Sequence, residues 1–373
     1  MSARLFTPLK LRSLTLPNRV VVAPMCQYSA INGRVQAWHL AHLSQYVLSA
    51  AGMLIVEATA VEAEGRITAG CVGLYDEATE TALAQLMQTL RSVAPMRIAI
   101  QLAHAGRKAS SARPWEGGVL VRPETGGWQP AGPSALAVSE NEPAPRELTA
   151  NDVQALVQRF VEATLRADRI GFDAIELHAA HGYLLHQFLS PIANQRTDQY
   201  GGSLENRMRF PLAVFAAMRA AWPAHKPMGV RLSATDWVAD SGWDVPQAIE
   251  FAQRLERLGA DWIDVSSGGV SPRQQIRVGP GYQVPFAAAI RAAVKIPVMA
   301  VGMITEPRQA EDILAEGKAD LIAIARGMLY NPRWVWHAAA ALGAQIDEAP
   351  RQYWRSQPRE HAELFGKTRF GAR

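Results

Sequence analysis

The stretch FDAIELHAAHGYLLHQFLS, residues 172–190, joins an apolar run to two imidazoles and a phenol. The apolar, β-prone part ends at His178, and His181 and Tyr183 follow within five residues. Strand ends of this kind carry the chemistry of α/β folds, because catalytic groups gather at the carboxyl ends of the strands. Two hydrogen-bond donors beside a proton donor suit a reaction that builds negative charge on oxygen and then needs a proton.

Short β-prone runs alternate with amphipathic helical patterns almost from end to end of the chain. Several runs are apolar without alternation, which is typical of strands covered on both faces. Eight units of strand and helix without a break in composition predict one α/β domain over residues 1–373, a (β/α)8 TIM barrel. The alternative, a doubly wound open sheet, normally carries a G-x-G-x-x-G turn after its first strand, and none follows Ala23. The predicted strands are Arg19–Ala23, Met53–Thr59, Arg97–Ala103, Phe172–His178, Met228–Leu232, Asp261–Ser266, Pro297–Val301 and Asp320–Ala325.

Three segments fall outside the eight units. Pro8–Leu16 is expected to form an N-terminal hairpin that closes the end of the barrel opposite the strand ends. Residues 104–146, which follow the third strand, are dense in Gly, Pro, Ser and Trp. A connection of that length is unusual unless it covers a site, so we expect a lid-like insertion that caps the mouth of the barrel. Residues 344–373 are expected to be a C-terminal extension.

Composition excludes several classes of protein. The chain is 49% hydrophobic and 19% charged, with a net charge of +4 and no dense block of Lys or Arg, so nucleic-acid binding is not favoured. Cys26 and Cys71 are the two cysteines, which argues against a disulfide-built secreted fold. The N-terminus lacks the apolar core of a secretory signal, and no apolar stretch reaches the roughly 18–20 residues of a membrane span. These features predict a cytoplasmic enzyme.

The first strand ends in Ala23-Pro24-Met25-Cys26, and Tyr28 lies just beyond it. A free cysteine is most often a small buried hydrophobe. The position of Cys26 at the catalytic end of a strand favours a functional role equally, so both interpretations remain open.

Polar residues also interrupt the third and fifth strands. Gln101 near the end of the third strand needs partners for its amide, and a heteroaromatic ring with alternating donors and acceptors would provide them. Arg231 in the apolar fifth strand demands a counter-charge, which either Asp264 or an anionic ligand would supply.

The last two strands carry the signals for a phosphate group. The runs Val298–Met303 and Ile322–Gly327 both end in small residues. Loops after the seventh and eighth strands of such barrels frequently bind phosphate through backbone N–H groups, and Arg326 adds a charged contact. Glycines also mark ordinary turns, so the two runs indicate a phosphate site only when taken together.

A metal site is the main alternative at the fourth strand. Strand alternation places Glu176 and His178 on one face, and His181 follows closely, so the three side chains could ligate a metal. A metal-dependent lyase or aldolase on the same barrel is therefore the alternative function. No further cluster at ligand spacing occurs at the other strand ends, which favours a site without metal.

With these residues assembled, the chain resembles the Old Yellow Enzyme family of FMN-dependent ene-reductases, and within it the bacterial thermophilic-like subgroup that includes xenobiotic reductases. The similarity runs from about residue 5 to about residue 356, and the motifs that carry it stand in the family's order. They are LPNRVVVAPMCQY at 16–28, QLAHAGR at 101–107, HAAHGYL at 178–184, NQRTDQYGGS at 194–203, VGMI at 301–304 and AR at 325–326.

The resemblance implies an FMN that lies across the mouth of the barrel, with its phosphate near Gly302, Ala325 and Arg326. It implies that Arg231 lies at the N1/C2 carbonyl edge of the isoalloxazine and tunes its electronics. The remaining residues that it implies as contacts of the flavin ring are Ala23, Pro24, Met25, Cys26, Ala58 and Gln101.

The resemblance also implies the reaction. NADPH or NADH would reduce the FMN, and the reduced flavin would then reduce the activated C=C bond of an α,β-unsaturated carbonyl or nitro compound. His178 and His181 would hold the substrate oxygen, Tyr183 would donate the proton, and Tyr28 would line the pocket. Arg355 in the C-terminal segment would enter the active site of a neighbouring subunit, which implies a homodimer or homotetramer. A flavin-storing protein without catalysis would need no Tyr183.

Overall fold

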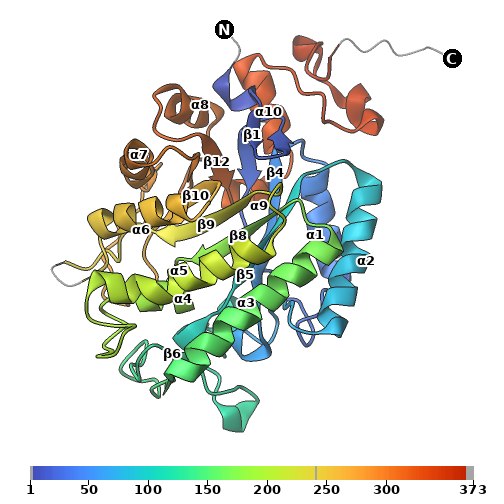
Figure 1. Cartoon of the computed structure of the whole chain (residues 1–373). Helices are drawn as coiled ribbons and strands as arrows, with labels where there is room; N and C mark the ends of the chain where they lie inside the picture. The colour runs from blue at the N-terminus through green and yellow to red at the C-terminus, as the bar shows by residue number, and fades with distance from the viewer. Residues whose placement is uncertain (1–2, 240–241, 367–373) are drawn as a thin grey trace.

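The computed structural model describes residues 3–239 and 242–366 and forms a closed barrel of eight parallel strands (Figure 1). The strands follow one another around the barrel in chain order, as a (β/α)8 barrel requires. Each of them overlaps its predicted run, so the predicted architecture is confirmed. The eight strands are β3 (Val20–Val22), β4 (Met53–Ala60), β5 (Ile98–Ala103), β8 (Ala174–Ala179), β9 (Met228–Ser233), β10 (Trp262–Ser266), β11 (Val298–Ala300) and β12 (Leu321–Ile324).

Helices connect the strands and cover the outside of the barrel (Figure 1). The longest, α3, begins where the Thr149 hydroxyl accepts a hydrogen bond from the Asp152 amide and ends at Gly171, whose φ of 90° is easily reached only by glycine. The helices are α1 (Ala37–Val47), α2 (Glu77–Val93), α3 (Ala150–Ile170), α4 (Leu184–Leu189), α5 (Leu204–Ala221), α6 (Val245–Arg257), α7 (Val284–Ala293), α8 (Pro307–Ala315), α9 (Arg326–Tyr330) and α10 (Trp334–Leu342).

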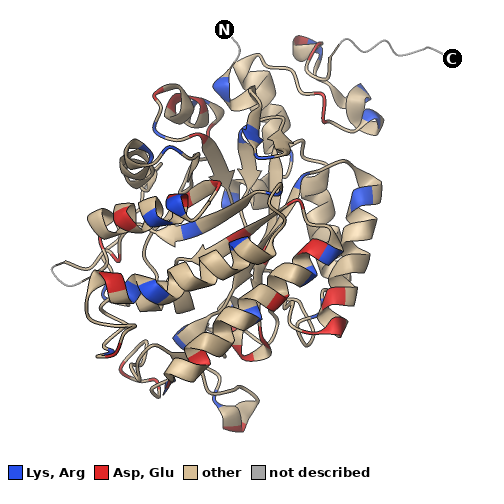
Figure 2. Cartoon of the chain, in the orientation of Figure 1, with Lys and Arg blue, Asp and Glu red and all other residues tan. Residues whose placement is uncertain are grey.

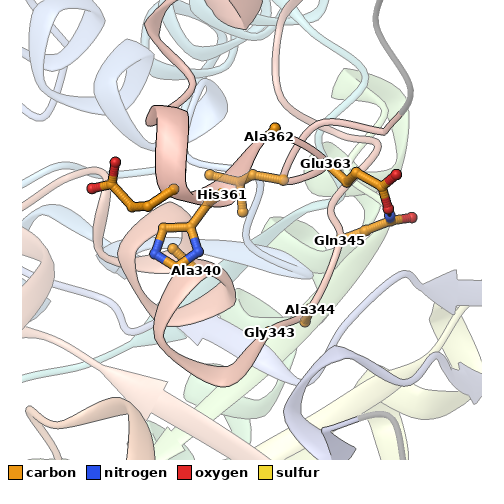
Figure 3. Close-up of a pocket in the computed structure, with 9 residues that line it drawn as sticks. Ala340, Gly343, Ala344, Gln345, His361, Ala362 and Glu363 are labelled. Carbon is orange, nitrogen blue, oxygen red and sulfur yellow. The ribbon is translucent and has the colours of Figure 1, made fainter.

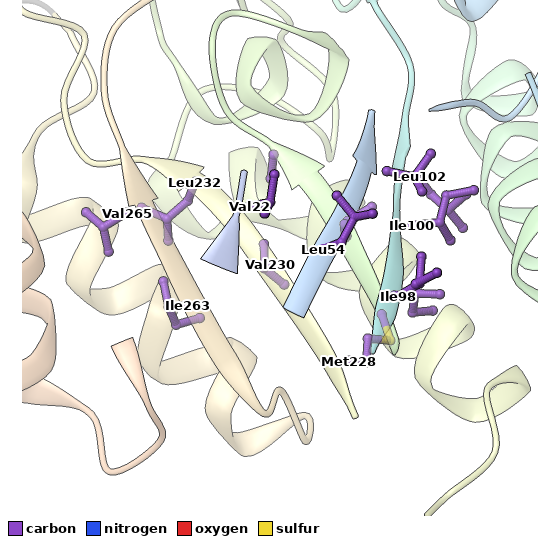
Figure 4. Packing of buried hydrophobic residues seen from close by; sticks show 14 of the residues in the cluster. Val22, Leu54, Ile98, Ile100, Leu102, Met228, Val230, Leu232, Ile263 and Val265 are labelled. Carbon is purple, nitrogen blue, oxygen red and sulfur yellow. The ribbon is translucent and has the colours of Figure 1, made fainter. Parts of the chain in front are cut away.

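Side chains that point outward from the strands form the apolar layer beneath the helices. Figure 4 shows part of this layer, in which Ile98, Ile100 and Leu102 of β5 pack beside neighbouring residues of β4. These alternate residues are fully buried because the helices cover them. Burial of such aliphatic side chains is the main stabilising contribution in a fold of this kind.

The N-terminal hairpin consists of β1 (Leu9–Leu11) and β2 (Leu14–Leu16). Leu11 and Leu16 are at most 2% exposed and pack against inward-facing residues near the strand starts, among them Met53 and Trp262. The hairpin therefore plugs the amino-terminal end of the barrel, as the sequence predicted.

The insertion of residues 104–146 contains short 3-10 turns and β6 (Ala131–Gly132), which pairs with β7 (Arg146–Glu147). Trp115 packs edge-on against Tyr28, with ring centroids 5.8 Å apart, and Arg113 Nε donates to the Tyr28 carbonyl at 3.0 Å. The insertion thus holds the loop that follows β3. Its role as a lid remains a prediction.

The outer helices carry Lys and Arg interspersed with Asp and Glu in the view of Figure 2. Alternation of this kind is typical of a solvated surface. Among the described residues, no helix combines the length and the apolar character that a membrane span requires.

Candidate active site

Four polar side chains, here called the polar layer, occupy inward-facing positions on neighbouring strands of the barrel, and Arg231 is also the register partner of His178. Gln101 of β5 lies opposite Glu176 of β8, and Arg231 of β9 lies opposite Asp264 of β10. All four side chains are at most 7% exposed. Since residues two apart on a strand share a face, His178 of β8 and Ser266 of β10 project from the same faces, one step closer to the mouth.

The layer is held together by hydrogen bonds and one ion pair. Glu176 Oε1 accepts from Gln101 Nε2 at 2.8 Å, and Glu176 Oε2 accepts from Trp262 Nε1 at 3.1 Å. Arg231 Nε lies 3.1 Å from Asp264 Oδ2, so Asp264 is the counter-charge that the sequence suggested. Burial, followed by the charge of Asp264, raises the pKa of Glu176 to about 8. Glu176 therefore keeps its proton at neutral pH.

This arrangement removes the basis of the metal alternative. Both oxygens of Glu176 are engaged by Gln101 and Trp262, and neither is free to join His178 and His181 around an ion. Within residues 3–239 and 242–366, no group of three or more His, Cys, Asp or Glu side chains could hold a metal. A metal-dependent lyase or aldolase has no support in this geometry.

The structure brings His178, His181 and Tyr183 together at the mouth of the barrel, as the sequence predicted. The chain turns sharply after β8, with φ of 58° at His181 and 70° at Gly182. The ring centroid of His178 lies 5.1 Å from that of His181 and 5.1 Å from that of Tyr183, and both contacts are edge-on. The His178 ring thus contacts both the imidazole of His181 and the phenol of Tyr183.

Electrostatics fix the protonation of these three groups. Burial, followed by the charge of Arg231, lowers the pKa of both His178 and His181 well below its ordinary value, so both rings are neutral. Burial raises the pKa of Tyr183 well above 10, so its phenol keeps its proton. The cluster consists of two neutral imidazoles and one protonated phenol.

Lys108 is a site residue that the sequence interpretation missed. Its ammonium group lies 4.8 Å from the centre of the Tyr183 ring and donates to the carbonyls of His181 at 2.8 Å and Gly269 at 3.0 Å. Burial lowers the pKa of Lys108 to about 8. The residue directly follows the QLAHAGR motif, and that adjacency was the only available signal.

Two cysteines meet at the end of β3. A hydrogen bond with Cys71, followed by burial, raises the pKa of Cys26 well above its ordinary value, and the same bond lowers the pKa of Cys71 to about 7. Cys71 also lines a small cavity together with Ala58 and Tyr183. Cys26 is therefore a neighbour of a residue that lines this cavity, and its role in the site remains a prediction; Cys71 is a neighbour that the sequence interpretation missed.

A cavity of about 390 Å³ opens where β11 and β12 end, with Arg231 and Arg326 among its lining residues. The backbone amides of Gly302 and Met303 have no hydrogen-bond partner in the described part of the chain, and neither does the side chain of Arg326. Gly302 has φ of 118°, and a Cβ atom there would lie 2.7 Å from Gln283 Nε2. Free amides and an unpaired guanidinium suit a phosphate, so these residues fit the FMN that the sequence implies.

The other predicted flavin contacts surround the same mouth. Ala23 continues from β3 and donates its amide to Ile324 of β12 at 3.1 Å, which places the start of the Ala23-Pro24-Met25-Cys26 segment beside the phosphate cavity. Ala325 lines this cavity. Gln101 donates from its amide nitrogen to Glu176, and its amide oxygen makes no hydrogen bond with the residues that the structure describes.

A second cavity lies apart from this site, between α10 and the C-terminal segment (Figure 3). Its volume is about 270 Å³, and Ala340, His361 and Glu363 are among its lining residues. None of the residues that line it belongs to the mouth of the barrel. It contributes nothing to the site described above.

Arg355 lies in the 3-10 turn Arg351–Ser356 of the C-terminal segment and is exposed. In Figure 1 this segment lies near β1 and α10, at the end of the molecule opposite β6. The structure therefore does not bring Arg355 to the mouth of its own barrel. Residues 367–373 of the predicted extension lie outside the described residues.

Comparison with known proteins agrees with this geometry. Residues 4–345 match the model of the NADH:flavin oxidoreductase / NADH oxidase family. The chain is 43% identical to an NADPH dehydrogenase of Geobacillus thermodenitrificans, over 95% of this chain and 98% of that protein. It is 42% identical to an NADPH dehydrogenase of Bacillus subtilis, over 95% of this chain and 99% of that protein.

Solved structures show the same fold. Morphinone reductase superposes with a TM-score of 0.76 and 30% identity, over 94% of this chain and 93% of that one. A 2-naphthoyl-CoA reductase superposes with a TM-score of 0.81 and 25% identity, although this chain spans only 53% of that longer protein. The barrel, the match to the family model and these relatives together show that the chain belongs to the Old Yellow Enzyme family of FMN-dependent NAD(P)H oxidoreductases.

Proposed function

We propose that this enzyme reduces the activated C=C bond of α,β-unsaturated carbonyl compounds, and of the corresponding nitro compounds, at the expense of NADPH or NADH. The observation that carries the proposal is the cluster of His178, His181 and Tyr183, which Ser266 links to the cavity at the ends of β11 and β12. Two neutral donors and one protonated phenol are the groups that an enolate-forming reaction needs.

The two histidines act on the substrate oxygen. Negative charge grows on the carbonyl oxygen when hydride is added to the β-carbon, and preorganised N–H donors stabilise that charge more than they stabilise the neutral ground state. Donors held in a site of this kind are worth several kcal/mol, and about 1.4 kcal/mol changes a rate tenfold. FMN, when bound, supplies the hydride that it has received from the nicotinamide.

Tyr183 gives its proton to the α-carbon, since burial keeps the phenol protonated at neutral pH. The ammonium group of Lys108 over the ring stabilises the phenolate that proton donation leaves behind. Tyr28, held by the insertion, lines the substrate pocket, and residues 104–146 form a partial lid over it.

The remaining residues hold the cofactor. Gly302, Ala325 and Arg326 would hold the phosphate, and Arg231 would lie near the N1/C2 carbonyl edge of the flavin, where its charge would favour the reduced state. The other contacts of the ring are Ala23, Pro24, Met25, Cys26, Ala58 and Gln101. Arg355 is contributed by a neighbouring subunit, so we infer a homodimer or homotetramer; the position of its segment away from its own barrel mouth is consistent with this.

The test is the variant Tyr183→Phe, measured by stopped-flow with cyclohexenone. We expect flavin reduction by NADPH to keep its rate, while enone turnover falls by about 10²–10⁴-fold, the range for loss of a general acid. Tyr46→Phe changes a buried phenol of α1 outside the site and is the matched control. Enone turnover at the wild-type rate in Tyr183→Phe would remove the tyrosine from its role, and a wild-type enzyme with no enone turnover would leave a flavin-storing protein.

A further inference from the structure

Three hydrogen bonds hold His181, one at its ring and two at its backbone. Its Nε2 atom lies 2.7 Å from the hydroxyl of Ser266 on β10. Its backbone N–H donates to Ser233 Oγ at 2.9 Å, and its carbonyl accepts from Lys108 at 2.8 Å. Nδ1 makes no hydrogen bond with any described residue. Nδ1 is therefore available to a ligand, and the ring cannot flip without losing its contact with Ser266.

A neutral imidazole carries one proton, so its position decides what His181 can do. With the proton on Nδ1, the ring donates to a substrate oxygen. With the proton on Nε2, the ring donates to Ser266 and meets the substrate with a bare lone pair. His178 has the same choice, which is settled by the backbone: the Ala180 amide donates to His178 Nδ1 at 3.3 Å, which leaves the proton on Nε2.

The surroundings of Ser266 indicate which way its own proton points. Ser266 Oγ lies 3.3 Å from Gln283 Oε1, its other acceptor. The orientation of the Gln283 amide is settled, because Nε2 donates to the Val301 carbonyl at 3.0 Å, and Oε1 already accepts from Ser267 at 2.5 Å. The His181 nitrogen at 2.7 Å is the nearer of the two possible acceptors, and Gln283 Oε1 already has a donor in Ser267, so the shorter contact is the better place for the Ser266 proton.

We propose that Ser266 is a positioning residue that donates to His181 Nε2 and thereby holds the ring proton on Nδ1, toward the substrate oxygen. His178 Nε2–H and His181 Nδ1–H then form a pair of donors, one set by a backbone amide and the other by a side-chain hydroxyl. The inference rests on the proposed function, since it assigns a role within the same oxygen-binding site. Ser266 also lines the cavity at the ends of β11 and β12, and its proposed effect on the substrate oxygen is exerted through His181.

The chain offers a matched control in the next residue. Ser267 donates to Gln283 Oε1, the oxygen that also lies 3.3 Å from Ser266, and no hydrogen bond joins it to His181 among the described residues. Ser266→Ala should weaken the binding of p-hydroxybenzaldehyde to the FMN-loaded enzyme about ten- to a hundredfold, the range for losing a hydrogen bond to a charged group. Ser267→Ala should change the dissociation constant less than twofold, and Ser266→Thr should restore it. Titration with p-hydroxybenzaldehyde, followed by the change in flavin absorbance, measures the dissociation constant of all three variants.

A second readout reports the tautomer directly. In enzyme labelled with ¹⁵N-histidine, two-bond ¹⁵N–¹H correlations should show the His181 proton on Nδ1 in the wild type and in Ser267→Ala, and a shift toward Nε2 in Ser266→Ala. A wild-type proton on Nε2, or equal weakening of phenol binding by both alanine variants, overturns the assignment of Ser266. Absence of enone turnover in the wild type would instead defeat the proposed function, so the two failures are distinguishable.

Discussion

The inside of this barrel has two unlike halves. On the strands β11, β12, β3 and β4, inward-facing side chains are apolar, and Val21, Ile55 and Met299 pack against the hairpin plug. On the adjoining strands β5, β8, β9 and β10, the middle layer consists of Gln101, Glu176, Arg231 and Asp264. Both halves are equally buried, so the division arises from side-chain chemistry rather than from exposure to water.

The two halves contribute differently to the free energy of folding. Apolar side chains contribute to folding when they leave water, whereas each buried charge costs several kcal/mol before its partner offsets that cost. Well-packed hydrophobic side chains in place of a buried ion pair often leave the stability of a fold unchanged or increase it. Glu176 and Asp264 lie one step beneath His178 and Ser266 on their own strands, and Arg231 is the register partner of His178, which indicates that the polar layer serves the site at the mouth.

Breaking the ion pair should have the largest effect. Asp264 and Met299 are register partners on neighbouring strands, one in each half, so Asp264→Asn and Met299→Leu compare nearly isosteric changes at the same depth. We expect Asp264→Asn to lower the free energy of unfolding by about 3–5 kcal/mol, because Arg231 loses its counter-charge, and Met299→Leu by less than about 1.5 kcal/mol. Urea denaturation of the holoenzymes measures both. Equal losses would mean that the polar half is not organised by charge.

Glu176 should make the stability of the polar half depend on pH. Its pKa rises from an ordinary value of 4.5 to about 8 on folding, so the folded state holds a proton that the unfolded chain releases. The stabilisation is complete below about pH 4.5 and is lost as pH rises toward 8, with a slope of at most about 1.4 kcal/mol per pH unit. Glu176→Gln should remove this slope, whatever it does to stability at one pH. Urea denaturation between pH 5 and 8 measures this dependence. If the free energy of unfolding changed with pH equally in wild type and variant, the assignment of the slope to Glu176 would be wrong.

Much of the fold followed from local sequence patterns. Strands such as β5 and β8 were predicted because their apolar runs are continuous. His178, His181 and Tyr183 lie within six residues of one another, so a short segment was enough to predict that they meet.

The missed contacts depend on long-range register. Ser266 reaches His181 from 85 positions away, and Lys108 reaches it from 73, so no spacing along the chain could reveal either contact. Glu176 was a possible metal ligand in the sequence because the partners of its oxygens, Gln101 and Trp262, are brought by other strands. A single strand shows which face a residue occupies but not which neighbours already satisfy it.

The smallest effect is expected in the apolar half. Ile55→Val removes one methyl group from the cluster around the hairpin and should lower the free energy of unfolding by about 0.5–1.5 kcal/mol. Because Ile55 contacts no member of the polar layer through a hydrogen bond or charge, phenol affinity and enone turnover should stay within twofold of wild type. If turnover fell with stability, the apolar half would also set the geometry of the site, and the two halves of the barrel would have to be treated as one cooperative unit.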